Sequence, residues 1–119
     1  MLSDGLDLTA EQRELLLALL RRHLPDVATW AHGSRVTGKA RPHSDLDLVV
    51  FAAPQQAAAI ALLKEACEES LLPFRVDLLV WDELPESFQR NIAARHAVVW
   101  EGQEGAKGGG PAVPKERAG

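Results

Sequence analysis

The chain has a single cysteine among its 119 residues and no apolar run of membrane-spanning length. One cysteine excludes an internal disulfide and a metal site built from several cysteines. A membrane-spanning helix needs roughly 18 to 20 apolar residues in succession, and the N-terminus lacks the basic and then apolar pattern of a secretory signal. We therefore expect a cytoplasmic protein without a membrane segment, and we interpret Cys67 as a small buried side chain of the core.

The sequence also lacks an excess of basic residues. Lysine and arginine together number 13 against 17 acidic residues, which gives a formal net charge of -4. A negative surface repels a phosphate backbone, so this charge argues against broad binding of nucleic acid. The histidines lack the mutual spacing of a zinc site. We favour a structural role for them, and the alternative for His32 and His43 is contact with a ligand of the segment 33–42 that they flank.

The length and composition predict one domain and a tail. A chain of 119 residues can form a single core but has no room for a second large domain. Glycine and proline are concentrated after residue 101, where large apolar side chains are almost absent. We expect a folded domain over residues 1–101 and a disordered tail over residues 102–119.

Local patterns predict alternating helices and strands. Thr9 and Gln12 form a capping box before a run of leucines at helical spacing, and Pro25 ends that helix. The expected helices span about 10–23, 54–71 and 83–95, and the expected strands span about 27–32, 46–52, 75–81 and 97–100. This order predicts an α+β fold, with a small mixed β-sheet of about four strands and helices packed on it.

Two acidic residues lie at the start of the second expected strand. Asp45 and Asp47 are two residues apart, so both carboxylates face the same side while Leu46 and Leu48 face the core. Neighbouring carboxylates repel one another, and their oxygens suit Mg²⁺ or Mn²⁺, so we interpret the pair as metal ligands. The alternative is that Asp45 ends a turn and Asp47 lies on an exposed edge.

A third acid is expected on the next strand. Asp77 interrupts the apolar run 75–81, which costs stability unless the carboxylate is paired or binds a metal ion. Asp82 is the rival candidate, but it lies at the end of the strand, and we interpret it as the N-terminal cap of the following helix. We therefore assign Asp77 to the candidate catalytic and metal site, together with Asp45 and Asp47.

A glycine-serine turn and three basic residues precede these acids. Gly33 directly follows a strand, so it can turn the chain and present backbone N–H groups and the Ser34 hydroxyl to a phosphate. A short helical turn from Ser34 would add its dipole. Arg35, Lys39 and Arg41 supply positive charge around the same point, and we include all five residues in the candidate nucleotide-binding site.

The same segment also matches the start of a different nucleotide-binding motif. Gly33 to Lys39 fits the G-x-x-x-x-G-K pattern of a P-loop, but that motif continues with serine or threonine and this chain has Ala40. The P-loop interpretation also leaves Asp45 and Asp47 without a function and requires a larger parallel domain. We therefore favour the metal-dependent interpretation.

Together these residues resemble a known signature. Gly33-Ser34, ten further residues, Asp45-Leu46-Asp47-Leu48 and a later Val76-Asp77-Leu78 resemble the signature of the DNA polymerase beta-type nucleotidyltransferase superfamily. The short length resembles its minimal nucleotidyltransferase (MNT) proteins, and the resemblance covers about residues 10–100. It implies a polymerase beta-like fold in which Gly33 and Ser34 bind the triphosphate of ATP. It also implies that Asp45 and Asp47 hold two Mg²⁺ ions, and that Asp77 helps hold the catalytic ion and activates the attacking hydroxyl.

The resemblance also implies a partner. MNT proteins are commonly paired with a helical HEPN protein, often a toxin ribonuclease, and act as its antitoxin by transferring AMP to one of its tyrosines. This chain has no tyrosine, so a tyrosine acceptor must lie on another molecule. We therefore expect AMP transfer from ATP to a hydroxyl group of a HEPN-type protein.

Two other functions stay open at this point. A non-catalytic antitoxin or adaptor would neutralise its partner by occlusion, with the nucleotide-binding fold as a scaffold. Transfer to a small molecule such as an aminoglycoside needs an acceptor-binding surface that this chain lacks, unless a homo-oligomer supplies it. The presence of all three acids favours catalysis.

Overall fold

The helices and strands follow one another in the predicted order. The computed structural model describes residues 5–102, so the expected tail, apart from Gly102, lies outside the described residues. Between residues 5 and 102 the α-helices are α1 (Ala10–His23), α2 (Ser34–Thr37), α3 (Ala57–Glu68) and α4 (Glu86–Ala94). The strands are β1 (Thr29–His32), β2 (Leu46–Val50), β3 (Val76–Val80) and β4 (Ala97–Trp100), and short 3-10 turns η1 (Pro54–Gln56) and η2 (Trp81–Glu83) precede α3 and α4.

Helix α1 has the predicted capping box. The Thr9 hydroxyl accepts a hydrogen bond from the Gln12 backbone N–H at 3.0 Å, and Gln12 Oε1 accepts one from the Thr9 backbone N–H at 3.0 Å. These bonds satisfy N–H groups that would otherwise lack a partner at the start of a helix. Leu16 and Leu20, one helical turn apart, are fully buried in the core. The cap and the leucine spacing therefore set the start and the buried face of α1.

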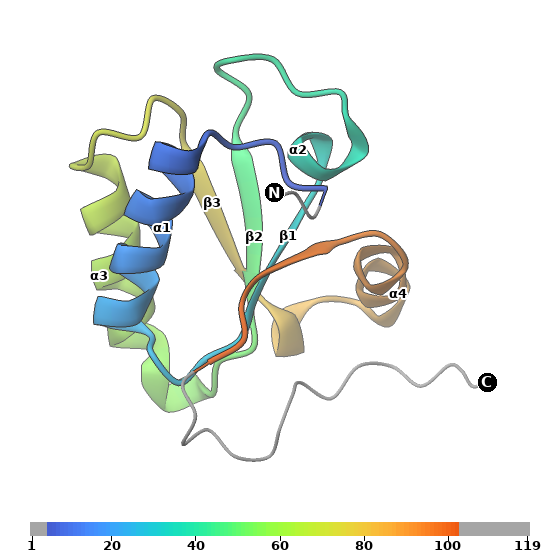
Figure 1. The fold of residues 1–119 in the computed structure, drawn as a ribbon. Helices are drawn as coiled ribbons and strands as arrows, with labels where there is room; N and C mark the ends of the chain where they lie inside the picture. The colour runs from blue at the N-terminus through green and yellow to red at the C-terminus, as the bar shows by residue number, and fades with distance from the viewer. Residues whose placement is uncertain (1–4, 103–119) are drawn as a thin grey trace.

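The strands form one mixed sheet in the order β3-β2-β1-β4. Strand β1 pairs antiparallel with β2 and with β4, whereas β2 pairs parallel with β3. A parallel pair needs a crossover connection, which η1 and α3 supply. Helices α1 and α3 cover one face of the sheet, and α4 lies on the other side (Figure 1). The predicted α+β fold with a mixed four-stranded sheet is confirmed.

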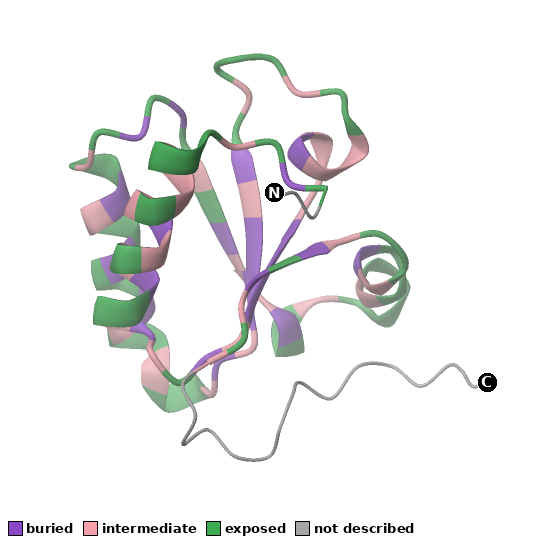
Figure 2. Cartoon of the chain, in the orientation of Figure 1, coloured by how far each residue is buried: buried purple, intermediate pink, exposed green. Residues whose placement is uncertain are grey.

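The alternation of side chains along β2 divides them between two clusters. Leu48 is fully buried in the larger cluster, which includes residues of α1 and α3. Val49 is fully buried in the smaller cluster, which also contains Trp30 of β1 and Ile92 of α4. Figure 2 shows buried residues along the strands and exposed residues along the outer sides of α1 and α3. Asp47 shares the face of Val49, so it lies on the α4 side of the sheet.

Helix α4 starts later than the sequence predicts, and Asp82 does not cap it. Asp82 is exposed in the η2 turn, and the N-cap of α4 is Pro85. Leu84 is extended, with ψ of 147°, because the residue before a proline avoids the helical region. The predicted capping role of Asp82 is therefore wrong. Within residues 5–102 no helix is long and apolar enough to cross a membrane.

Candidate active site

The predicted acids lie together near one end of the sheet. The parallel register of β2 and β3 pairs Asp47 with Asp77, and the antiparallel register of β1 and β2 pairs Asp47 with His32. Paired residues on neighbouring strands share a face. His32, Asp47 and Asp77 therefore form one row across three strands, and Asp45 lies immediately before β2.

The electrostatic environment of Asp47 reflects this arrangement. Burial raises the pKa of its carboxyl group most, and the carboxylates of Asp77 and Asp45 raise that pKa further. The guanidinium group of Arg75 acts in the opposite direction. The folded chain therefore disfavours a negative charge at Asp47, first because the carboxyl group is partly buried and second because negative charge exceeds positive charge around it.

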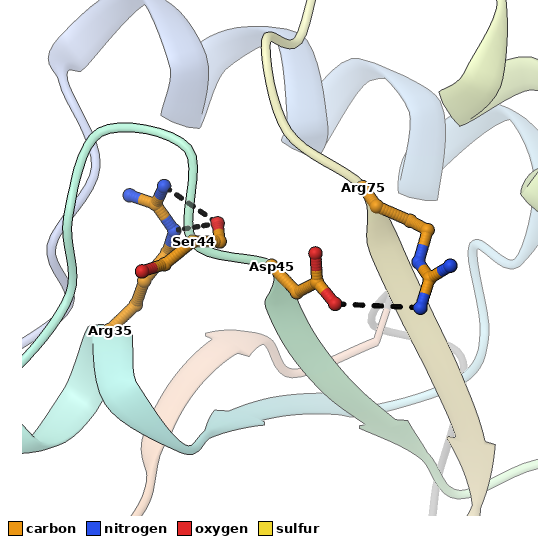
Figure 3. Close-up of polar contacts among 4 residues, drawn as sticks. All are labelled: Arg35, Ser44, Asp45 and Arg75. Atoms are coloured by element: carbon orange, nitrogen blue, oxygen red, sulfur yellow. Dashed lines mark hydrogen bonds and ion pairs between the residues drawn. The ribbon is translucent and has the colours of Figure 1, made fainter.

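Arg75 is a member of this cluster that sequence reasoning missed. Its Nη2 lies 3.5 Å from Asp45 Oδ2 (Figure 3). Arg75 immediately precedes β3, and the pairing of Val76 with Leu46 places Arg75 next to Asp45. The sequence indicates this contact only indirectly. The parallel register that pairs Asp77 with Asp47 also brings Arg75 next to Asp45, and that register cannot be read from either segment alone.

The acids fit a divalent metal ion by their chemistry and not by a preformed cage. Within residues 5–102 no three His, Cys, Asp or Glu side chains converge closely enough to hold a metal ion as they stand. Asp45 is turned toward Arg75 (Figure 3). Carboxylate oxygens are preferred ligands of Mg²⁺, and a cation would offset both the burial of Asp47 and the neighbouring negative charge, which together raise its pKa. The metal-binding roles of Asp45, Asp47 and Asp77 stay predictions with which this charge distribution agrees.

Gly33 brings the backbone against the carboxylate of Asp47. Its φ of 84° and ψ of -156° lie in a region that glycine alone occupies readily. A Cβ atom at Gly33 would overlap Asp47 Oδ2 and lie 3.3 Å from Asp47 Cγ. The Gly33 carbonyl accepts hydrogen bonds from the N–H groups of Val36 and Thr37, which begin the helical turn α2 predicted from Ser34. The glycine turn and the acid row are therefore neighbours in space.

Arg35 has a different position from the one expected of a nucleotide-binding residue. The residue is buried, with 4% of its surface exposed, and its guanidinium carbon lies 4.1 Å from the centre of the Phe74 ring. Its N–H groups donate hydrogen bonds of 2.8 to 3.3 Å to the backbone carbonyls of Asp7, Arg41, Pro42 and Ser44. Figure 3 shows the bonds to Ser44. Arg35 therefore holds the loop that follows α2, and we remove it from the candidate nucleotide-binding residues.

Replacing Arg35 by lysine is expected to lower the free energy of unfolding by about 1–2 kcal/mol. The compact ammonium group of lysine lacks the planar fork of donors with which the guanidinium group reaches several carbonyls at once. Thermal unfolding followed by circular dichroism should show a fall in Tm of roughly 4–12 °C. Arg41→Lys makes the same chemical change at an exposed position of this loop and should alter Tm by less than about 3 °C. Equal Tm values for the two variants would contradict the structural role of Arg35.

The remaining predicted nucleotide-binding residues lie around the same loop. Ser34 is half-buried at the start of α2, and Lys39 and Arg41 are exposed between α2 and β2. The Arg41 backbone N–H donates to Ser44 Oγ at 2.8 Å, which orders this part of the loop. Binding of a nucleotide by Ser34, Lys39 and Arg41 stays a prediction.

His32 is a polar residue of the site that the sequence analysis interpreted as structural. Its Nε2 atom is buried and has no hydrogen-bond partner among residues 5–102. Burial lowers the pKa of the imidazole, while the carboxylate of Asp77 acts to raise it. The Phe88 ring of α4 approaches edge-on, with ring centres 6.1 Å apart. His32 joins the acid row because β1 pairs with β2, and the residues next to His32 in the sequence do not reveal this pairing.

Comparisons with known proteins agree with the resemblance stated above. Residues 15–105 match the family model described as Polymerase beta, Nucleotidyltransferase. A protein of Haemophilus influenzae named Probable protein adenylyltransferase MntA is 42% identical over 97 residues, which cover 81% of this chain and 85% of the relative.

Solved structures share the fold at lower identity. A crystal structure of a toxin-antitoxin with AMP-PNP is 23% identical, with a TM-score of 0.62, and the match covers 78% of this chain and 75% of that chain. A crystal structure of a mutant of the toxin-antitoxin MntA-HpeT is 21% identical, also with a TM-score of 0.62, and covers the same shares of 78% and 75%. At these identities the likeness shows the fold alone.

Proposed function

Because this chain belongs to the polymerase beta nucleotidyltransferase family, we propose that it transfers AMP from ATP to a hydroxyl group of a protein partner. The pairing of Asp47 with Asp77 on neighbouring strands, beside the Gly33 turn, is the observation that carries this proposal. It places acidic side chains next to a turn whose backbone can approach a phosphate. The protein adenylyltransferase name of the relative with 42% identity supports the same reaction.

Each residue of the site has a proposed role. Gly33 and Ser34 bind the triphosphate, and Lys39 and Arg41 add positive charge from the exposed loop. Asp45, Asp47 and Asp77 hold two divalent ions, Mg²⁺ or Mn²⁺, which when bound supply charge neutralisation for the triphosphate and lower the pKa of the attacking hydroxyl.

The proposed reaction is an in-line displacement. The acceptor oxygen forms a bond to the α-phosphorus of ATP, the bond from that phosphorus to the oxygen bridging to the β-phosphate breaks, and pyrophosphate leaves as the hydroxyl proton is released. Asp77 is exposed, whereas Asp47 beside it is half-buried, so Asp77 is the acid of this pair that an acceptor can approach from solvent. We assign Asp77 the role of orienting the acceptor hydroxyl and assisting its deprotonation.

We propose a HEPN-type toxin as the acceptor, neutralised by the transferred AMP. A tyrosine acceptor must lie on another molecule, because the chain contains no tyrosine. The MNT resemblance implies such a partner, and the fold occurs in a crystal structure of a toxin-antitoxin with AMP-PNP. We place the reaction in the cytoplasm, where ATP is supplied.

Labelling of the partner tests the proposal. The protein is incubated with ATP labelled at the α-phosphate, Mg²⁺ and a candidate HEPN-type acceptor protein. We expect label on the partner with the natural protein and with Asp82→Asn, and none with Asp77→Asn. These variants make the same change at the two rival acids. Absence of label on the partner, or equal label with Asp77→Asn, would refute the proposed reaction, and toxin inhibition without ATP would favour occlusion instead.

Lys39→Ala is expected to raise the KM for ATP about 3- to 10-fold and to change kcat little. Lys39 is exposed, so solvent screens the attraction between its charge and the triphosphate and limits its contribution to binding. Steady-state labelling at varied ATP concentration measures both constants. Lys64→Ala, which removes an exposed lysine from α3, is the matched control. Loss of all turnover in Lys39→Ala, with turnover retained in Asp47→Ala, would restore the P-loop interpretation.

A further inference from the structure

Arg75 provides positive charge at the acid row. Its guanidinium group pairs with Asp45 at 3.5 Å (Figure 3). The pairing of Val76 with Leu46 in the parallel register of β2 and β3 keeps Arg75 beside Asp45. This cation therefore contacts one of the residues proposed to hold the metal ions.

The backbone of Arg75 is held by the sheet, while its charged group is exposed to solvent. The Arg75 carbonyl accepts a hydrogen bond of 2.8 Å from the Leu46 N–H, which ties it to the start of β2. The Arg75 side chain is 71% exposed and that of Asp45 is 46% exposed. At 3.5 Å the contact is longer than a charge-assisted hydrogen bond, and exposed ion pairs of this kind are weak. The guanidinium can therefore leave Asp45 while the strand stays in place.

We propose that Arg75 neutralises the acids before the nucleotide binds, and that its guanidinium then moves from Asp45 to the triphosphate as the metal-bound nucleotide enters. This inference rests on the proposed function. A metal ion and a guanidinium group compete for the same carboxylate, so Arg75 weakens the binding of a free metal ion. The planar fork of arginine suits phosphate oxygens, so the same residue strengthens the binding of a triphosphate.

This dual role predicts changes of opposite sign in one variant. Arg75→Ala should bind free Mn²⁺ about 3- to 10-fold more tightly, because a charge that repels the ion is removed. The same variant should bind the nucleotide about 3- to 10-fold more weakly at saturating Mn²⁺, because a phosphate contact is lost. A merely structural defect would weaken both. Arg75→Lys keeps the charge without the fork, so its Mn²⁺ affinity should stay close to that of the natural protein.

Two binding titrations test the proposal without any transfer reaction. Free Mn²⁺ is measured by electron paramagnetic resonance during titration of the nucleotide-free protein, and α,β-methylene-ATP binding is measured by calorimetry at saturating Mn²⁺. Arg90→Ala is the matched control, because Arg90 also forms an exposed ion pair, with Glu86 at 3.1 Å on α4. The control should match the natural protein in both titrations.

The outcomes separate this inference from the proposed function. If Arg75→Ala binds Mn²⁺ no more tightly than Arg90→Ala, including the case in which neither binds detectably, the inference is wrong. Unchanged nucleotide affinity in Arg75→Ala also overturns it. Failure of the partner-labelling reaction, with both titrations as expected, would refute the proposed reaction while the role of Arg75 at the metal and nucleotide site stands.

Discussion

Replacing Asp47 by asparagine is expected to lower the rate of AMP transfer at least 1,000-fold, which corresponds to about 4 kcal/mol of transition-state stabilisation. Asp47 is the central acid of the row, paired with Asp77 on one side and His32 on the other. An amide keeps the size of the side chain but lacks the charge that a divalent ion requires. The loss should therefore appear in kcat and persist at high ATP concentration.

The same variant is expected to be slightly more stable than the natural protein when no metal is present. The pKa of Asp47 is raised in the folded state, so folding favours its protonated form. That preference stabilises the fold below the pKa of the unfolded chain and is lost as the pH rises through the folded-state pKa. At neutral pH the charge therefore destabilises the fold, and because the site is partly exposed we expect a gain of about 0.5 kcal/mol, or roughly 2–4 °C in Tm.

Partner labelling in the presence of Mg²⁺ measures the loss of transfer. Thermal unfolding in the presence of EDTA measures the gain in stability. Asp82→Asn is the control, because it removes an exposed acid outside the row. Its transfer rate and Tm should stay near those of the natural protein. An Asp47→Asn protein that retains a tenth of the natural rate, or that unfolds at a much lower temperature, would contradict the proposed role.

Gly33→Ala is expected to lower the transfer rate at least 100-fold. Its φ of 84° is unfavourable for alanine, and the new Cβ would overlap Asp47 Oδ2. Relief of this overlap must move either the turn or the carboxylate, and displacements of this kind are costly to catalysis. We therefore expect damage to both triphosphate binding and metal binding, visible as a higher KM and a lower kcat.

Gly38→Ala separates the steric effect from the backbone effect. Gly38 also has a positive φ, of 82°, but a Cβ at that position meets nothing within 4 Å. Both variants should lose about 1–2 kcal/mol of stability from the backbone conformation, whereas only Gly33→Ala should lose transfer beyond about fivefold. Equal loss of transfer in the two variants would show that strain alone explains the effect, and would remove the argument for contact between Gly33 and Asp47.

Much of the fold was predictable because its signals are local. The capping box of Thr9 and Gln12 and the alternation around Asp47 depend on residues that are close in the sequence. The acids were found as candidates because charge within an apolar strand is costly without a partner. The late start of α4 also had a local cause in Pro85, which the prediction overlooked in favour of Asp82.

The parts that could not be predicted depend on contacts between distant segments. Arg35 reads as an ordinary loop cation, yet one of its carbonyl partners, Asp7, lies 28 positions away in the sequence. Arg75 lies next to Asp45 only through the register of β2 and β3. Single-sequence patterns carry no information on these pairings. Arg35 was therefore expected at the nucleotide site but has a structural role, whereas Arg75 was not expected there but lies beside the acids.

The hydrogen bonds of Arg35 have a consequence for the affinity of the site. They fix the carbonyls of Arg41, Pro42 and Ser44, and thus the shape of the loop that carries Lys39 and Arg41. A flexible loop loses conformational entropy when a ligand orders it, and that loss weakens binding. Here these hydrogen bonds restrict the loop backbone when the chain folds, so a nucleotide bound as proposed would have to order mainly the exposed side chains.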